Sequence, residues 1–182
     1  LSEIFFLKIL KKLLLIFTLS LIFIGTGSYV FAEVTYVDDP VVILETNLGN
    51  ITIEFFSLDA PNHRTNFIVL AKSGFYDGTL FHRIIPGFMI QGGDPNTISG
   101  SSTTWGLGGP DNKIDAEFNT IEHKRGIVSM ARSADPNSAG SQFFIVHKDS
   151  NFLDGEYTVF GRIATDESYE TLDKIAELKT TP

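Results

Sequence analysis

The chain reads FHRIIPGFMIQGGD at residues 81–94, the most informative stretch of the sequence. Large apolar side chains on both sides of a Pro-Gly pair predict two short strands, at 81–85 and 88–91, with a turn between them. Arg83 and Gln91 are polar residues within these apolar runs. Burying a guanidinium costs free energy unless a partner satisfies it. Arg83 is therefore either one half of a structural ion pair or a functional group that faces a cleft.

Short strands are expected on both sides of this stretch. Apolar residues alternate with polar ones through 51–56, which is the two-residue period of a strand with one buried face, and a turn joins this run to another at 41–45. Three more strands are expected at 126–130, 142–146 and 159–163. Short strands separated by Gly- and Pro-rich turns favour a closed barrel or a sandwich over a parallel α/β sheet.

Two helices and one long loop complete the expected organisation. Asp59, followed by Ala-Pro, is expected to cap a helix that ends at Gly74. A second helix is expected at 166–178, where apolar residues recur at helical spacing. Residues 95–110 are rich in Gly, Ser and Thr, and we expect them to form one surface loop that borders a functional surface.

Residues 1–32 differ in composition from the rest of the chain and are expected to direct export. Three lysines precede an uncharged run at 13–24, and small residues follow as far as Ala32. This is the order of a secretory signal, with cleavage expected after Ala32. The alternative is an uncleaved membrane anchor, since the segment 13–32 is long enough to span a bilayer without a charge.

Length and charge fit one exported domain. The 182 residues suit a targeting segment, a linker at 33–40 and a single domain at 41–182. The chain has 22 acidic and 14 basic side chains, for a formal charge of -8. This charge argues against a nucleic-acid partner, because neutralising phosphates requires clustered Lys and Arg. Membrane contact is expected only through residues 1–32, if they are retained.

The sequence offers little support for metal, redox or hydrolase chemistry. The chain has no cysteine, which excludes disulfides, thiolate nucleophiles and Cys-ligated metals. Its four histidines lack the paired spacing of metal ligands, so no cofactor is expected. Ser141 stands in Gly-Ser-Gln rather than in a nucleophile elbow, which argues against a serine hydrolase.

Two further runs complete a pattern that resembles a known family. They are GIVSMAR at 126–132, followed by QFFIV at 142–146, and NFLDGEYTVFG at 151–161. Together with the motif at 81–94, they resemble the cyclophilin-type peptidyl-prolyl cis-trans isomerases from about Val41 to Gly161. The resemblance implies a mainly β fold, a closed eight-stranded antiparallel barrel capped by two helices.

The resemblance also implies the residues of a site. Arg83 matches the catalytic residue, and the backbone of Arg132 matches the segment that pairs with the substrate peptide. The positions that match the family's substrate pocket are His82, Phe88, Met89, Gln91, Ala131, Arg132, Gln142, Phe144, Phe152, Leu153 and Tyr157. Proline-containing polypeptides are therefore the expected partners, and the protein is expected to act as a monomer.

The residue types suit rotation about an X-Pro bond. This rotation has a barrier of about 18 to 20 kcal/mol because it breaks amide resonance. An apolar pocket disfavours the charge-separated planar amide, and Arg83 can donate a hydrogen bond to the prolyl nitrogen only once resonance is lost. We therefore expect an exported isomerase that assists the folding of extracytoplasmic polypeptides. The alternative is a non-catalytic module or chaperone that holds Pro-containing segments in the same pocket, and the presence of both Arg83 and Gln91 favours the enzyme.

The sequence departs from the family pattern at two places. Many eukaryotic members have Trp at the position of Phe152 and His at that of Tyr157, so we expect weak inhibition by cyclosporin. After Leu178 the chain has only four more residues, whereas the family fold continues to a last strand. We expect the domain to be truncated at its C-terminus, which would leave an exposed sheet edge.

Overall fold

The computed structural model describes residues 4–12 and 39–178, with side chains from residue 40 onward. The strands are β1 (Ile4–Lys12), β2 (Asp39–Thr46), β3 (Gly49–Phe55), β4 (Arg83–Ile85), β5 (Met89–Gly92), β6 (Ile127–Met130), β7 (Phe143–Val146) and β8 (Val159–Ile163). The helices are α1 (Pro61–Lys72), α2 (Asn96–Ser99) and α3 (Asp166–Ala176), with short 3-10 turns η1 (Ser102–Thr104), η2 (Pro136–Ser138) and η3 (Asn151–Leu153). None of the helices in the described ranges is both long and apolar enough to cross a membrane.

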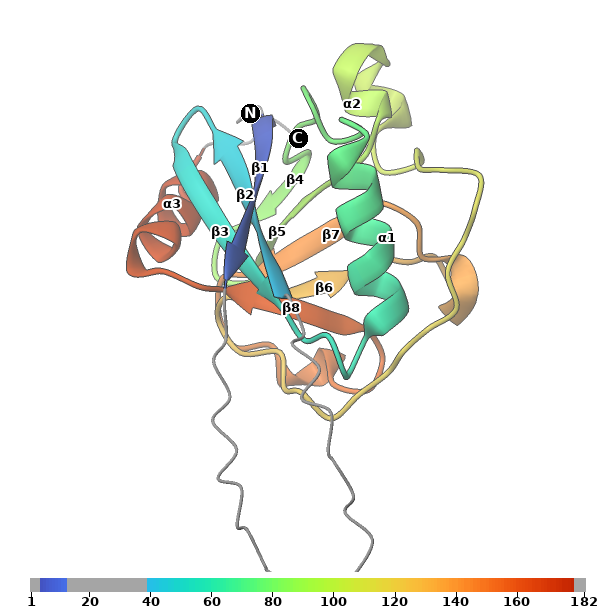
Figure 1. Cartoon of the computed structure of the whole chain (residues 1–182). Helices are drawn as coiled ribbons and strands as arrows, with labels where there is room; N and C mark the ends of the chain where they lie inside the picture. The colour runs from blue at the N-terminus through green and yellow to red at the C-terminus, as the bar shows by residue number, and fades with distance from the viewer. Residues whose placement is uncertain (1–3, 13–38, 179–182) are drawn as a thin grey trace, which may run out of the picture.

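The described strands form one antiparallel sheet that curls around a hydrophobic core (Figure 1). The strand order of this eight-stranded sheet is β1-β2-β3-β8-β6-β7-β5-β4. Helices α3 and α1 lie on opposite sides of the curled sheet, where α3 contacts β3 and α1 contacts β8. The predicted mainly β antiparallel class is confirmed. The ring of strands remains open in the described residues, because β1 and β4 end the sheet and no ladder joins them.

Strand β1 comes from the segment that was expected to precede the domain. Its backbone pairs with the outer edge of β2, from Ile4 opposite Thr46 to Lys12 opposite Asp39. This pairing satisfies N–H and C=O groups that an uncovered edge would leave unpaired. The expected apolar run, the cleavage site and most of the linker lie in residues 13–38, outside the described residues. Residues 179–182, on which the expectation of a truncated domain rests, also lie outside them.

Helix α1 begins without the cap that the sequence predicts. Its N-cap position is Ala60 rather than Asp59, and no side chain there accepts a hydrogen bond. The carboxylate of Glu117 accepts instead from the backbone N–H groups of Asn62, at 3.0 Å, and His63, at 2.9 Å. A negative charge at this end also complements the helix dipole. The prediction of an Asp59 cap was wrong because a distant carboxylate supplies the acceptor.

Two apolar clusters fill the interior of the sheet. The larger one centres on Phe67 of α1, whose ring centroid lies 4.9 Å from that of Tyr76, 5.2 Å from Phe143 and 5.3 Å from Phe160. The buried members of the smaller cluster are Met89, Ile127, Phe144, Val146, Leu153 and Val159. Three of these residues, Met89, Phe144 and Leu153, also line a cavity at the surface. The smaller cluster therefore joins the core to the candidate site.

Residues 95–110 form an organised segment rather than one featureless loop. The segment contains α2 and η1, and it is held by Asp94, whose side chain is buried. The Asp94 carboxylate accepts from the backbone N–H groups of Asn96, at 2.8 Å, of Gly106, and of Gly108, at 3.3 Å. Glycine is required at position 108, because a Cβ atom there would collide with the side chains of Asp94 and Asn96.

Candidate functional site

Arg83 and Gln91 face each other across the β4–β5 pair. They are direct partners in the antiparallel register, and Arg83 Nη1 donates to Gln91 Oε1 at 3.4 Å. The same nitrogen lies 3.9 Å from the sulfur of Met89. Within the described residues no carboxylate lies within 4.0 Å of the guanidinium, which is exposed. Of the two interpretations of Arg83, the structure favours a functional group that faces a cleft.

The guanidinium borders a small cavity, which we call the cup. Its volume is about 160 Å³, and its lining residues are Arg83, Phe88, Met89, Gln91, Ala131, Arg132, Phe144, Leu153 and Tyr157. Phe144 packs edge-to-face against Tyr157, with ring centroids 5.6 Å apart and planes at 86°. All nine residues belong to the predicted site, so the fold brings together four segments that are far apart in the sequence. Their individual roles stay predictions.

The three other predicted residues lie outside the cup. Gln142 is next to it, where its Nε2 donates to the Gly108 carbonyl at 2.8 Å and its Oε1 accepts from Gln91 at 3.0 Å. Phe152 is 72% exposed, and its ring lies 5.4 Å from that of Phe88, which makes it part of the rim.

His82 lines neither the cup nor the neighbouring cavity. Burial lowers the pKa of His82 below its ordinary value. The sequence motif places His82 beside Arg83 in the chain, but of these two residues only Arg83 lines the cup.

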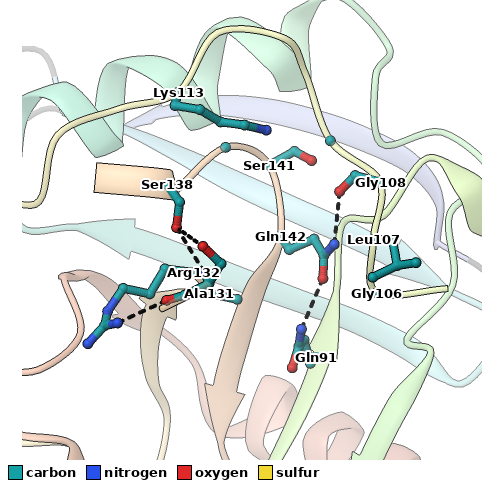
Figure 2. A pocket seen from close by; sticks show the side chains of 13 residues that line it. Gln91, Gly106, Leu107, Gly108, Lys113, Ala131, Arg132, Ser138, Ser141 and Gln142 are labelled. Atoms are coloured by element: carbon teal, nitrogen blue, oxygen red, sulfur yellow. Dashed lines mark hydrogen bonds between the residues drawn. The ribbon is translucent and has the colours of Figure 1, made fainter. Parts of the chain in front are cut away.

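A second cavity of about 250 Å³ adjoins the cup (Figure 2). The two cavities share Gln91, Ala131 and Arg132, and the second one extends under the segment 106–109. Its lining is largely polar, and its charged members are Lys113 and Arg132. The Lys113 ammonium donates to the Pro110 carbonyl at 2.9 Å and lies at the edge of the cavity. The glycine-rich segment was predicted to border a functional surface, but Lys113 was not predicted, because nothing in the local pattern distinguishes it from a surface lysine.

Arg132 separates the two cavities and offers its backbone to a ligand. Its guanidinium lies over the ring of Tyr157, 4.8 Å from the centroid, and Nε donates to the Glu156 carbonyl at 3.0 Å. The preceding N–H, of Ala131, donates to the Gln142 carbonyl. Within the described part of the chain, the N–H and C=O groups of Arg132 have no such partner. An extended peptide could therefore pair with them while its side chains enter the cavities.

No group of three His, Asp or Glu side chains in the described ranges is placed to hold a metal ion. A guanidinium donor stands beside an apolar floor, and amide groups fix its position. This arrangement can bind a peptide and direct a hydrogen bond at one of its atoms, but it includes no nucleophile.

Comparisons with known proteins agree with this geometry. Residues 41–182 match the family described as cyclophilin type peptidyl-prolyl cis-trans isomerase/CLD. A peptidyl-prolyl cis-trans isomerase of Helicobacter pylori strain J99 is 48% identical over 136 residues, which cover 74% of this chain and 79% of the relative. One of Synechococcus elongatus is 48% identical over 130 residues, which cover 71% of this chain and 84% of the relative.

Solved structures show the same likeness. The crystal structure of a Cryptosporidium parvum cyclophilin type peptidyl-prolyl cis-trans isomerase, determined in the presence of the dipeptide Ala-Pro, is 37% identical in sequence and superposes with a TM-score of 0.69. The alignment covers 78% of this chain and 87% of that chain. A cyclophilin from Hirschia baltica is 30% identical, with a TM-score of 0.64 and coverage of 78% and 68%.

Proposed function

The chain belongs to the cyclophilin type peptidyl-prolyl cis-trans isomerase family, and from this premise we propose that Arg83 and the cup catalyse X-Pro rotation in exported polypeptides. Isomerase activity follows from the family and its close relatives. The assignment of residues and the class of substrates are what we add. The observation that carries the assignment is the position of Arg83, whose guanidinium is held by Gln91 beside a buried apolar floor.

The mechanism requires no bond to be made or broken. The planar amide is stabilised in water by charge separation, so transfer into the cup of Phe88, Met89, Phe144 and Leu153 disfavours it relative to the twisted state. In the twisted state the prolyl nitrogen regains its lone pair and can accept a hydrogen bond from Arg83. That bond exists only in the transition state, which is the condition for raising kcat.

The magnitudes show that Arg83 cannot act alone. Acceleration by a thousandfold to a hundred-thousandfold requires about 4 to 7 kcal/mol. One charge-assisted hydrogen bond supplies about 1.5 to 3 kcal/mol. Desolvation in the cup, together with peptide pairing to the Arg132 backbone beside Gln91 and Gln142, must supply the rest.

The first prediction tests Arg83 with a protease-coupled or NMR-exchange assay on a short X-Pro peptide. We expect Arg83→Ala to lower kcat/KM by about tenfold to more than a hundredfold, which corresponds to the loss of one charge-assisted hydrogen bond. Arg83→Lys should recover little, because a point-charge ammonium lacks the planar fork. The melting temperature should change little, since the side chain is exposed and has no carboxylate partner in the described residues.

The outcomes separate the enzyme from the alternative. A sharp drop in melting temperature with Arg83→Ala would contradict the catalytic assignment. A folded wild-type protein that binds the peptide without accelerating its isomerisation would favour the non-catalytic binding module.

Export is the second part of the proposal, and the composition of residues 1–32 supports it. Mass spectrometry of the protein from native soluble and membrane fractions tests it. A soluble extracytoplasmic form that begins at residue 33, and therefore lacks β1, is expected. An intact segment 1–32 in the membrane fraction would show an anchor instead, and the intact protein in the cytoplasm would contradict export altogether.

A further inference from the structure

His123 is a fully buried histidine that lies directly behind the cup. Its ring stacks against that of Phe144, with centroids 6.0 Å apart and planes at 14°. Its Nδ1 lies 2.9 Å from Asp154 Oδ1, and its backbone N–H donates to the same oxygen at 2.7 Å. Phe144 is therefore packed between His123, away from the cavity, and Tyr157, which lines it.

The other ring nitrogen of His123 connects to the strands that carry the cup. Nε2 lies 3.1 Å from the hydroxyl oxygen of Ser129, and that hydroxyl lies 2.8 Å from the Thr158 carbonyl. Ser129 of β6 is the direct register partner of Phe144 in β7. His123, Ser129 and Thr158 are buried behind the cup, Asp154 is partly exposed, and this network of four residues connects the segments that form the wall of the cup.

Each of the three residues linked to His123, directly or through Ser129, adjoins a residue that lines the cup. Asp154 follows Leu153, Thr158 follows Tyr157, and Ser129 faces Phe144 across the ladder. His123 itself lines neither cavity, so it does not touch a bound peptide.

The hydrogen bonds set the orientation of the imidazole. An ionised carboxylate can only accept, so Nδ1 carries the proton that points at Asp154. Burial lowers the pKa of His123 in spite of Asp154, which favours the neutral ring. The Ser129 hydroxyl donates its one proton to the Thr158 carbonyl, so Nε2 is in contact with the hydroxyl oxygen without accepting from it. The hydrogen bond at Nδ1, the stacking on Phe144 and the close packing around a fully buried ring fix the face that His123 presents to Phe144.

We propose that His123 is a positioning residue, which holds Phe144 and Leu153 where the prolyl ring lies in reach of Arg83. This inference rests on the proposed function. Displacing a bound group by about 1 Å can cost a hundredfold in rate. Because Arg83 stabilises only the twisted amide, a displaced prolyl ring should affect kcat more than KM.

The chain contains a matched control, the pair of His63 and Glu117. His63 is also fully buried, and its Nδ1 lies 2.6 Å from Glu117 Oε2. This pair caps α1, and the nearest ring is that of Phe160 at 6.5 Å. Neither residue lines the cup or the second cavity. Disturbing His63 should therefore affect stability in a similar way without disturbing the cup.

The experiment compares His123→Asn with His63→Asn in the full chain. In each variant the amide can still donate to the carboxylate, while the ring is removed. We expect both variants to lose stability. At a temperature well below both melting points, kcat/KM should fall about tenfold in His123→Asn, mostly through kcat, and change less than about twofold in His63→Asn.

A second pair of variants, Asp154→Ala and Glu117→Ala, tests the same inference if the asparagine variants do not fold. Both carboxylates are partly solvent-accessible, so a folded protein is expected, and only Asp154→Ala should lower kcat. Equal effects within a pair, or an unchanged kcat in both His123→Asn and Asp154→Ala, would overturn the inference. A wild-type protein that folds but has no isomerase activity would overturn both the proposed function and this inference. If the wild type is active and the two variants of each pair lose the same amount of activity, only the inference is overturned.

Discussion

Phe152 is a side chain on the rim of the cup that we expect to affect inhibition by cyclosporin more than turnover of substrate. The resemblance implies Trp at this position in many eukaryotic family members. Phe152 is 72% exposed and does not line the cup. An indole N–H donates a hydrogen bond that phenylalanine cannot make. The floor of the cup, formed by Met89, Phe144 and Leu153, does not depend on this residue.

We predict that cyclosporin inhibits this isomerase weakly and that Phe152→Trp tightens inhibition. The gain should be a few-fold to about tenfold, the value of one neutral hydrogen bond of about 0.5 to 1.5 kcal/mol. Turnover of a short X-Pro peptide should change little. Inhibition constants for the two proteins, measured in one assay, provide the check. Nanomolar inhibition of the wild type, or no tightening in the variant, would show that another position discriminates.

At the scale of elements, the segment 95–110 depends on a single buried carboxylate. Asp94 accepts from three backbone N–H groups, and the Gly108 carbonyl then accepts from Gln142 beside the cup. The segment is thus linked to the site through its backbone. This explains why a stretch rich in Gly, Ser and Thr has a defined path over the second cavity.

We predict that Asp94→Ala releases this segment. Amide hydrogen exchange at Gly106 and Gly108 should accelerate about tenfold or more, because each N–H loses its acceptor. Exchange in β3 and β8 should follow only the change in global stability. Asp111→Ala, at an exposed position nearby, serves as the control. Unchanged protection at Gly106 and Gly108 would mean that other contacts hold the segment.

At the scale of the whole molecule, buried histidines link stability to pH. Burial lowers the pKa of His63, His82 and His123 below the ordinary value of 6.5. The unfolded chain therefore binds more protons than the folded chain as the pH falls below about 6.5, so acid favours unfolding. A hydrogen bond from Arg125 lowers the pKa of Asp173, and its contribution is lost at still lower pH, below about 4.

We predict that the free energy of unfolding decreases between pH 7 and pH 5 and decreases further below about pH 4. Urea titrations across this range measure the effect. His63→Asn and His123→Asn should each reduce the slope above pH 5, because each removes a group that titrates differently in the two states. A flat profile between pH 7 and pH 5 would contradict the assignment of neutral buried imidazoles.

The sequence alone predicted much of the fold and most of the candidate site. The alternation through 51–56 and the apolar runs around residues 85, 128, 144 and 161 placed the strands, and the helices at 61–72 and 166–176 were predicted within a few residues. The motif at 81–94 and its companion runs singled out nine residues that line one cavity. These features are local, since periodicity, turn residues and motif spacing depend on neighbours a few positions apart.

Only the tertiary structure decided the contacts between distant segments. Glu117 caps α1 from 54 positions away, and His123 reaches Asp154 across 31 positions. Lys113 reaches a cavity whose other walls come from β5 and from the segments 106–109, 131–133 and 138–142. The position of His82 outside the lining of both cavities was decided in the same way. The sequence determined which residues form strands and which motif they carry. Which side chains meet depended on strand register and on the curl of the sheet, because both arise from packing the whole chain around one core.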